Sequence, residues 1–345
     1  MGLQENRAVS GAFTPPPSIQ EALEMNQTPS IVCIKSADTR ATPEVVYDGL
    51  LAPQAEVSPA FFYDELGSQL FNAITLLEEY QVTRDELEIF TANHQSIAEM
   101  LPNDCCLIDL GAGNCAKAAS LFNSIKPAQY LAIDVSEKTL RESLSALAQR
   151  SYSPTLSGLI IDFSKGLPSG CLTECTKVEL PRVFFYPGSS IGNFQPTEAT
   201  AFLRGLRLHH NAQSLVIGVD LIKSASMLEA AYNDGLGVTA AFNRNILRTL
   251  NHAVGTDFEP RKWQHVSYFN TKESRIEMHL QAIEDTQVSW PGGGRLFRLG
   301  ETIHTENSYK YTEASFSDLL ERAGFKVFAI YRSQSKGFAE FIACP

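Results

Sequence analysis

The middle of the chain alternates short apolar runs with segments of helical length. Apolar runs of strand length occupy residues 105–110, 129–135, 158–162, 182–187 and 214–220. Strands that alternate with helices build a mostly parallel sheet with helices packed on it. The pattern therefore predicts an α/β fold.

The end of the chain predicts a helix followed by a hairpin. Two further apolar runs, residues 326–332 and 337–344, follow a helical pattern at 312–325 and are joined by a Ser/Gly-rich link. Such a short link allows only antiparallel pairing, because a parallel return needs a dozen or more residues. We therefore expect one reversed strand at the end of the sheet. This resembles the Rossmann-like class I S-adenosylmethionine-dependent methyltransferases more than the dehydrogenases, whose sixth strand is parallel.

Two other regions depart from this rhythm. Residues 223–310 interrupt the sheet as an insertion, with a helical block at 226–254 and alternating segments at 263–283 and 294–311. Before the sheet, several apolar residues at helical spacing predict short helices. They are Leu66, Leu70, Ile74 and Leu77. Residues 1 to about 40 are rich in Pro, Ser, Thr and Gln, and we expect an extension that is either mobile or packed on the body.

Composition and charge disfavour several classes of partner. The chain has 345 residues and a net charge of -11, and its 28 basic residues form no cluster, which argues against nucleic acid. No apolar run approaches the ~20 residues of a membrane-spanning helix, and the first residues lack a secretory pattern, so we expect a cytoplasmic protein without a membrane partner. The seven cysteines are scattered, and Cys171 and Cys175 have no second Cys/His pair, so we expect no metal.

Three successive strand ends offer groups for an adenosyl ligand. The first turn, "LIDLGAGNCAK", contains Gly111 and Gly113, which let a ligand approach the backbone closely. Asp134 ends the second strand and can accept both ribose hydroxyls, although capping of the next helix is a simpler role for it. After the third strand, Asp162 can accept from an adenine amino group and Phe163 can cover the ring. Ligands sit beyond the carboxyl ends of such strands, so together these groups favour an adenosyl ligand.

The glycine turn also distinguishes between two possible cofactors, one with a pyrophosphate and one with a methionine carboxylate. The turn lacks the third glycine of G-x-G-x-x-G, which lets a helix approach a pyrophosphate. Asn114 and Lys117 offer partners for a methionine carboxylate instead. We therefore expect S-adenosylmethionine rather than NAD.

The stretch "FFYPGSSIGNF" contains the G-x-S-x-G spacing of a serine hydrolase. Ser190 would be its nucleophile, and Asp220 and His304 follow in the required order. An adenosyl-binding first turn and the lack of an HGGG-like loop argue against this chemistry. We expect the turn to offer backbone amides and the Asn193 amide to a substrate beside the donor.

At this point the sequence resembles the histidine-specific Nα-methyltransferases of ergothioneine biosynthesis over residues 40 to 345. The matching stretches, in family order, are "FFYDELGSQLFNAITLLEEYQVTRDE", "LIDLGAGNCAK", "FFYPGSSIGNF", "GVDLIKSASMLEAAYNDGLGVTAAFNRN", "RIEMHL" and "TENSYKY". The resemblance implies a methyltransferase core of 85–222 and 311–345, and a substrate-binding domain of 40–84 and 223–310, after the extension 1–39. Departures at Glu78, Gln81 and the glycine turn concern the fine preference for substrate.

The resemblance also implies roles for individual residues. Those expected to hold the donor are Gly111, Gly113, Lys117, Asp134, Asp162 and Phe163. Those expected near the substrate's amino and carboxylate groups are Tyr63, Gly188, Asn193 and Tyr232, with Tyr63 and Asn193 catalytic. Those expected around the imidazole are Tyr80, Met278, Glu306 and Ser308.

The Glu306 and Ser308 pair can be judged physically. A neutral imidazole has one nitrogen that donates and one that accepts, and two residues that are two apart on a strand point to the same side. Glu306 and Ser308 could serve both nitrogens, although an exposed polar strand face is the simpler interpretation without the family context.

The expected activity is trimethylation of L-histidine to hercynine by a monomer. Methylation of tyrosine or tryptophan, a donor-binding protein without activity, and a serine hydrolase remain as alternatives.

Overall fold

The computed structural model describes residues 29–33, 42–150, 154–164, 166–177 and 179–345. Most of the predicted extension 1–39 lies outside these residues. Its described part contains β1 (Ser30–Cys33), which pairs in parallel with β5 at the edge of the main sheet. The sequence pattern did not predict this strand.

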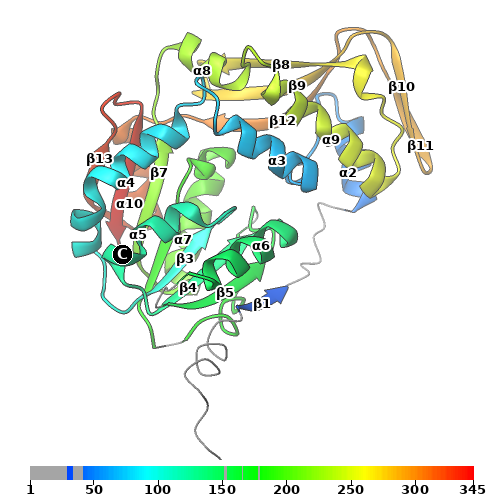
Figure 1. Cartoon of the computed structure of the whole chain (residues 1–345). Coiled ribbons are helices and arrows are strands. Elements are labelled where there is room, and N and C mark those ends of the chain that lie inside the picture. The colour runs from blue at the N-terminus through cyan, green and yellow to red at the C-terminus, as the bar shows by residue number, and fades with distance from the viewer. Residues whose placement is uncertain (1–28, 34–41, 151–153, 165, 178) are drawn as a thin grey trace, which may run out of the picture.

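The main sheet has eight strands in the order β1-β5-β4-β3-β6-β7-β14-β13 (Figure 1). Besides β1, its strands are β3 (Cys106–Leu110), β4 (Gln129–Asp134), β5 (Thr155–Ile160), β6 (Arg182–Tyr186), β7 (Ala212–Asp220), β13 (Lys326–Arg332) and β14 (Phe338–Cys344). All neighbours are parallel except that β14 runs antiparallel to both β7 and β13. The reversed strand is confirmed. It is the last strand of the chain, but it lies between β7 and β13 rather than at the edge.

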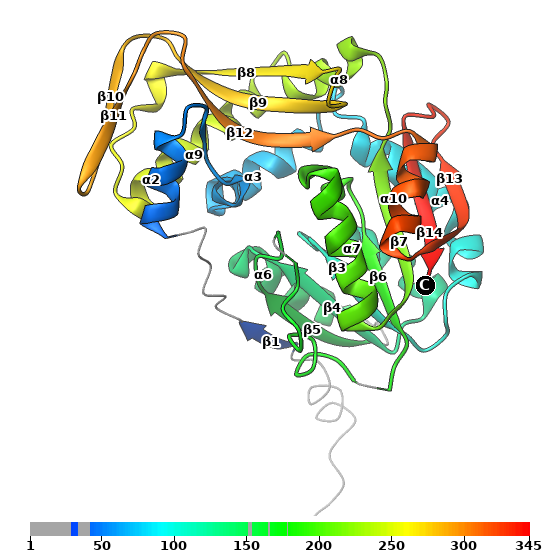
Figure 2. The same cartoon turned by 180° about the vertical axis from the view of Figure 1, so that it is seen from behind.

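Helices cover both faces of this sheet, because successive strand residues point to opposite sides. The helices on one face are α4 (Val82–Glu99), α5 (Ala116–Ile125) and α6 (Glu137–Ala148), and those on the other are α7 (Pro196–His210) and α10 (Glu313–Ala323). Figures 1 and 2 show the two layers from opposite sides. On β3, Ile108 packs on the α7 side and Leu107 on the α5 side. All the expected core strands and helices are present.

A second, four-stranded sheet lies over the carboxyl ends of the parallel strands (Figure 2). Its order is β2 (Ala55–Glu56), β12 (Thr302–Tyr309), β9 (Arg275–Ala282) and β8 (Trp263–Asn270), and a separate hairpin joins β10 (Thr286–Trp290) to β11 (Gly293–Phe297). The helices beside it are α2 (Pro43–Leu51), η1 (Pro59–Phe62), α3 (Glu65–Ile74), α8 (Ala225–Tyr232), α9 (Val238–Val254) and η3 (Pro260–Lys262). The strand β10 was not predicted.

The second sheet and its helices have their own hydrophobic cluster, which includes Phe62, Phe242 and Leu280. This cluster also contains Ile89 of α4 and Phe338 of β14, which belong to the predicted methyltransferase core. The apolar interior is therefore continuous between the two parts. The predicted division into two domains stays a prediction.

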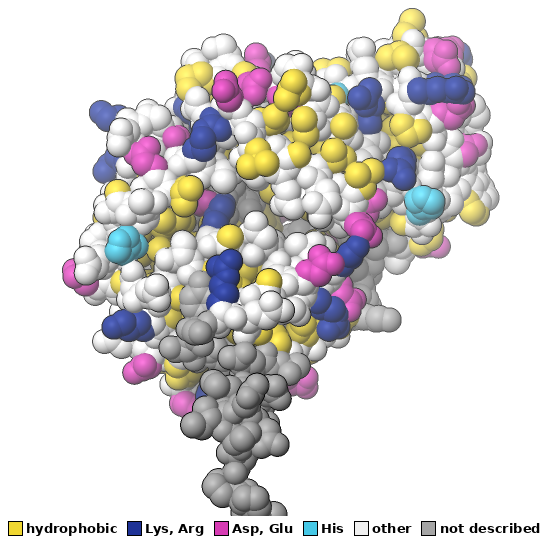
Figure 3. Space-filling view, in the orientation of Figure 1, with side chains coloured by type: hydrophobic (Ala, Val, Ile, Leu, Met, Phe, Trp, Pro, Cys, Tyr) yellow, Lys and Arg dark blue, Asp and Glu magenta, His cyan; other side chains and the backbone are white. Residues whose placement is uncertain are grey.

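The described helices include none that is both long and apolar enough to cross a bilayer. On the face shown in Figure 3, Lys and Arg side chains are interspersed with Asp and Glu and do not gather in one patch. The predicted absence of nucleic-acid and membrane partners, the cytoplasmic location and the monomeric state stay predictions.

Candidate active site

The first glycine turn connects β3 to α5 in a backbone conformation that favours glycine. Gly111 and Gly113 have φ of 73° and 51°, in the left-handed region. The Gly113 N–H donates to Asp134 Oδ2 at 2.8 Å, and the Ser136 N–H donates to Asp134 Oδ1 at 2.9 Å. Asp134 therefore ties the ends of β3 and β4 together. Burial raises the pKa of its carboxyl, while these backbone donors oppose the rise.

A cavity of about 1000 Å³ opens beside this turn. It is lined by the predicted donor residues Gly111, Gly113, Asp134, Asp162 and Phe163. Phe163 lies across the turn, with its ring tip 4.0 Å from where a β-carbon on Gly111 would be. The cavity has an acidic group on one strand end, an aromatic ring beside it and an exposed backbone turn, as an adenosyl ligand requires.

Lys117 is the predicted donor residue that lines neither this cavity nor the adjoining one. Its ammonium forms an ion pair with the fully buried Glu86 of α4. Glu86 in turn accepts a hydrogen bond of 2.5 Å from the N–H of Gly188. Glu86 therefore joins Lys117 to the turn after β6, which contains Gly188.

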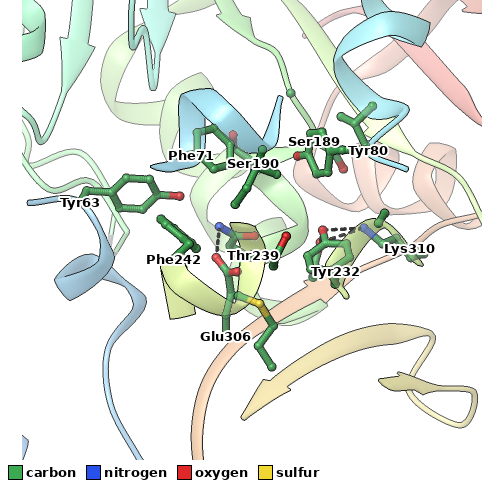
Figure 4. Close-up of a pocket in the computed structure, with 17 residues that line it drawn as sticks. Tyr63, Phe71, Tyr80, Ser189, Ser190, Tyr232, Thr239, Phe242, Glu306 and Lys310 are labelled. Atoms are coloured by element: carbon green, nitrogen blue, oxygen red, sulfur yellow. Dashed lines mark hydrogen bonds between the residues drawn. The ribbon is translucent and has the colours of Figure 1, made fainter. Parts of the chain in front are cut away.

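The second, smaller cavity is formed by side chains from both parts of the molecule (Figure 4). All eight predicted catalytic and substrate residues line it: Tyr63, Tyr80, Gly188, Asn193, Tyr232, Met278, Glu306 and Ser308. Tyr63 directly follows η1, and Tyr80 lies two residues before α4 begins. The others come from the turn after β6 and from α8, β9 and β12. The structure brings this set together, and the role of each residue stays a prediction.

The turn after β6 includes η2 (Ser190–Asn193) and does not form a hydrolase triad. The Ser190 hydroxyl donates to the Pro187 carbonyl at 3.3 Å, and Asp220 pairs with Lys223 and Lys310. His304 Nε2 lies 3.1 Å from the Glu306 carbonyl and 3.0 Å from Asn307 Oδ1. Each of the three hydrolase candidates is therefore committed to other partners, which argues against that chemistry.

Asn193 and Glu306 meet at the centre of the site. Asn193 Nδ2 donates to Glu306 Oε1 at 3.2 Å. Burial raises the pKa of the Glu306 carboxyl to about 7, while the Lys310 ammonium opposes this rise. A carboxyl with this pKa is partly ionised near neutral pH and is able to accept a proton or a hydrogen bond there.

Two buried tyrosines, Tyr63 and Tyr80, line the same cavity as Glu306. Burial, and then the charge of Glu306 among other groups, raises the pKa of Tyr63 well above its usual value, and burial does the same for Tyr80. Both hydroxyls therefore stay protonated and can donate. The Tyr63 ring lies edge-on to Phe71 and to Phe242, with centroids 6.0 Å apart in each pair.

The two cavities adjoin. Tyr63, Phe71, Ser190, Asn193 and Glu306 line both of them. A ligand held by Asp134 and a second held by Ser308 would therefore meet at Tyr63 and Asn193. This is the geometry required for transfer of a small group between two bound molecules.

Comparison with known proteins identifies the family. The model described as histidine-specific methyltransferase, SAM-dependent, matches residues 42–344. The chain belongs to this family. It is therefore an S-adenosylmethionine-dependent methyltransferase, and the predicted family, fold class and methyl donor are confirmed.

The methyltransferase is similar to two named histidine enzymes and to one that acts on another amino acid. It is 35% identical to the histidine N-alpha-methyltransferase of Mycobacterium tuberculosis (strain CDC 1551 / Oshkosh) over 81% of this chain and 87% of the relative. The enzyme of the same name from Mycolicibacterium smegmatis (strain ATCC 700084 / mc(2)155) is 32% identical over the same shares. The 4-dimethylallyltryptophan N-methyltransferase of Aspergillus fumigatus (strain ATCC MYA-4609 / CBS 101355 / FGSC A1100 / Af293) is 26% identical over 88% of this chain and 94% of the relative.

Several residues of the methyltransferase site were not predicted. Those that line the smaller cavity include Phe71, Ser189, Thr239, Phe242 and Lys310. Phe71 and Phe242 lie on amphipathic helices whose apolar spacing is the same as that of any core helix, so nothing in the sequence pattern distinguishes them. Lys310 lies two residues after Ser308 on the same predicted strand, and this spacing is the signal that could have identified it.

The described residues contain one group with the side chains of a metal site, formed by Glu277, His279 and His304. Glu277 already accepts hydrogen bonds from Arg275, Asn270, Tyr268 and His279. We interpret Glu277 and His279 of β9 as part of a polar network with β8, beside which His304 of β12 packs on His279. The prediction that the reaction needs no metal is not tested by it.

Proposed function

We propose that this methyltransferase converts L-histidine to Nα,Nα,Nα-trimethyl-L-histidine, hercynine, by three successive transfers to the α-amino nitrogen. This would be the first step of ergothioneine biosynthesis. The observation that carries the proposal is the meeting of two cavities at Tyr63, Asn193 and Glu306. The similarity to proteins named histidine N-alpha-methyltransferase supports the same substrate.

The proposal assigns the larger cavity to the donor. Asp134 would accept the ribose hydroxyls, since each of its oxygens has one backbone donor in the structure and keeps further lone pairs. Asp162 would accept from the adenine amino group and Phe163 would cover the ring. Lys117 would act on the donor carboxylate from the first turn of α5, with its charge partly balanced by Glu86.

The proposal assigns the smaller cavity to histidine. Gly188, Asn193 and Tyr232 would hold the amino and carboxylate groups. Tyr80, Met278, Glu306 and Ser308 would surround the imidazole, with the carboxylate of Glu306 accepting from the ring N–H. These positions are carried over from the family pattern and agree with the lining of the cavity.

When bound, S-adenosylmethionine would supply an electrophilic methyl group, which a neutral amine attacks in line while S-adenosylhomocysteine departs as the leaving group. The protein's task is to align the amine and to keep it unprotonated. The Asn193 amide and the Tyr63 hydroxyl are placed to orient the nitrogen lone pair. Each of the first two transfers leaves an N–H⁺ that must be lost before the next, and the third leaves a quaternary nitrogen with no proton. The scheme uses no metal.

A direct assay tests the proposal. Purified protein is incubated with methyl-labelled donor and each of the twenty amino acids, and the products are resolved by mass spectrometry. We expect histidine to be used best and to accumulate with three methyl groups on the α-nitrogen. Transfer to imidazole nitrogen, or a product that stops at one methyl group, would contradict it.

The main alternative is an Nα-methyltransferase of another aromatic amino acid. The similarity to a 4-dimethylallyltryptophan N-methyltransferase favours keeping it. An indole or a phenol offers no paired donor and acceptor for Glu306 and Ser308, and a polar group left unpaired in the pocket costs on the order of 1–3 kcal/mol. The same assay decides this point, because tryptophan or tyrosine would then outcompete histidine. Donor binding without transfer to any amino acid would instead indicate a non-catalytic protein.

A further inference from the structure

Lys310 is a buried cation at the inner end of the smaller cavity. It is the one Lys or Arg among the described residues that line this cavity, and Glu306 is the one carboxylate. The Lys310 side chain is 1% exposed. A lysine is almost never buried so completely unless its charge and its donors are satisfied, so its partners define its role.

Three partners take the three hydrogens of the Lys310 ammonium. Its Nζ lies 2.9 Å from Asp220 Oδ2, 2.9 Å from Ser308 Oγ and 3.1 Å from the Tyr232 hydroxyl oxygen. An ammonium has three donors and no acceptor, so its hydrogen-bonding capacity is fully used within the protein. Figure 4 shows Lys310 directed at Tyr232.

The two hydroxyls that Lys310 contacts also bond to each other. The Tyr232 hydroxyl and Ser308 Oγ are 2.8 Å apart. Each hydroxyl oxygen has one proton and two lone pairs, and the ammonium occupies one lone pair on each. The bond between them uses one proton and one more lone pair. The accepting oxygen then has no lone pair left and keeps its proton for the ligand, while the donating oxygen keeps one lone pair.

In the direction found in the structure, Ser308 is therefore the hydroxyl that can only donate toward the cavity. With Tyr232 donating, as in the structure, Ser308 Oγ accepts from both Lys310 and Tyr232 and can only donate. If Tyr232 instead donates to a substrate carboxylate, Lys310 still occupies one lone pair of Ser308 Oγ, which keeps its own proton for the ring. Lys310 cannot reverse this polarity, because an ammonium accepts nothing.

We propose that Lys310 is a positioning residue that makes this end of the cavity a hydrogen-bond donor, so that the site binds the neutral imidazole of histidine and rejects the imidazolium. The inference rests on the proposed function. A neutral imidazole offers a lone pair to the Tyr232 and Ser308 pair and an N–H to Glu306. An imidazolium offers two N–H groups, and one of them would face a donor beside a buried cation.

Other charged and titratable groups surround this pair and must be separated from the effect. Asp220 of β7 is held by two lysines, since Lys223 Nζ lies 2.5 Å from its other oxygen. Glu306 of β12, Tyr80, Tyr63 and, farther back, Glu86 of α4 also face the pair or its partners. The protonation of Glu306 alone would make histidine binding depend on pH, so a control ligand is needed.

The control ligand is 1,2,4-triazolylalanine, whose ring has an N–H and lone-pair nitrogens but stays neutral in mild acid. Dissociation constants of histidine and of triazolylalanine are measured by calorimetry with saturating S-adenosylhomocysteine, from about pH 5 to about pH 8. The two ligands have the same α-amino group and meet the same protein groups. The ratio of the two constants therefore reports the charge of the imidazole.

For the wild-type protein we expect this ratio to rise about tenfold for each pH unit below about 6.5. For Lys310→Met we expect a rise of less than about threefold over the whole range, because the freed lone pairs can accept from an imidazolium. Lys223→Met removes the other cation on Asp220 without touching either hydroxyl, and it should behave like the wild type. Should Lys310→Met fold poorly, Lys310→Met with Asp220→Asn removes the charge pair together and should give the same flattened ratio.

If histidine binds, two results overturn the inference. One is a ratio of dissociation constants that does not change with pH in the wild-type protein, and the other is the same rise of this ratio at low pH in the Lys310 variants as in the wild type. Absence of histidine binding at every pH, with another amino acid bound, refutes the proposed function instead. The two failures are therefore distinguishable.

Discussion

Glu306 is the residue through which the two cavities and the substrate ring are connected. Its carboxylate accepts a hydrogen bond from the Asn193 amide at 3.2 Å, and the charge of Lys310 opposes the rise of its pKa. The residue is 9% exposed. Its position on β12 is set by the pairing of Glu306 with Met278 on β9. Both residues therefore reach the cavity from neighbouring strands. The carboxylate is available for one ligand contact beside Asn193.

Replacement of Glu306 by alanine tests its assignment to histidine. Loss of a charged hydrogen bond in a buried site costs about 1.5–3 kcal/mol, so we expect histidine binding by Glu306→Ala to weaken by about 10- to 100-fold. Donor binding should change by less than about threefold, because Asp134 and Phe163 are untouched. Calorimetric titration with each ligand checks this. Equal losses for histidine and S-adenosylhomocysteine would remove Glu306 from the substrate site.

Asp109 shows how burial of one acid couples stability to pH. It precedes the glycine turn on β3, is 1% exposed, and accepts from the Tyr130 hydroxyl at 2.7 Å. Burial raises the pKa of Asp109 to about 7, against the smaller lowering effects of Tyr130 and Lys117. The folded protein therefore keeps a proton that the unfolded chain loses near pH 4. Stability from this group is present at low pH and is lost as the pH rises toward 7.

The variant Asp109→Asn should remove this dependence. An asparagine has no proton to lose, so we expect the variant to gain stability relative to the wild type between about pH 4 and about pH 8, by up to a few kcal/mol. Urea unfolding at both pH values measures it. A difference between wild type and variant that is the same at both pH values would show that Asp109 titrates normally.

At the scale of elements, Asp64 joins two helices that carry cavity residues. It is the N-cap of α3, where its Oδ1 accepts from the Gly67 N–H at 2.6 Å. The same oxygen accepts from Asn245 Nδ2 of α9 at 2.7 Å. Phe71 lies on α3 and Phe242 on α9, so this contact fixes two parts of the aromatic wall beside Tyr63.

We expect Asp64→Ala to lower the free energy of unfolding by about 1–3 kcal/mol, because it removes an N-cap and leaves Asn245 without its partner. Asp64→Asn is the matched control, since asparagine caps as well as aspartate and keeps an acceptor for Asn245. Its loss should stay below about 1 kcal/mol. Chemical denaturation compares the two, and similar losses would mean that the charge rather than the cap matters.

At the scale of the whole molecule, Glu86 connects the helix that follows the glycine turn to the turn after β6. It lies on α4, pairs with Lys117 of α5 and accepts from the N–H of Gly188. Glu340 of β14 faces the same point, since a β-carbon on Gly218 would meet both carboxylates within 2.6 Å. Burial, and then the charge of Glu86, raises the pKa of Glu340 well above its usual value. Glu340 therefore keeps a proton to higher pH than an exposed glutamate does.

This arrangement predicts opposite outcomes for two isosteric changes. Glu340→Gln replaces a protonated acid by a neutral amide and should leave the affinity for donor and histidine within about threefold. Glu86→Gln removes the partner of Lys117 and should weaken both ligands by about tenfold or more, since a buried ion pair is broken. Titration of both variants with both ligands checks this. Equal behaviour of the two would show that the contact between Glu86 and Lys117 does not support the two ligand sites.

The strands and the donor turn could be predicted because their signals are local. Apolar runs such as 326–332 coincide with a strand, and the short link after it permits only a hairpin. The strand β1 was missed because it has four residues and follows a Pro/Ser-rich stretch, so its pairing with β5 is decided by the sheet edge. The strand β10 was missed for a similar reason, since it is short and pairs with its neighbour β11 in a separate hairpin.

The sequence by itself determined the alternation of strands and helices, the reversed last strand, the glycine turn and, through its family resemblance, the residues around two ligands. These depend on spacing of a few residues or on motifs that are contiguous in the chain. Tertiary structure alone decided that Lys117 binds Glu86, that Lys310 lies behind Tyr232 and Ser308, and that the two cavities meet at Asn193. The physical reason is that buried charges take their partners from whichever elements packing brings near, and that choice is not written in local spacing.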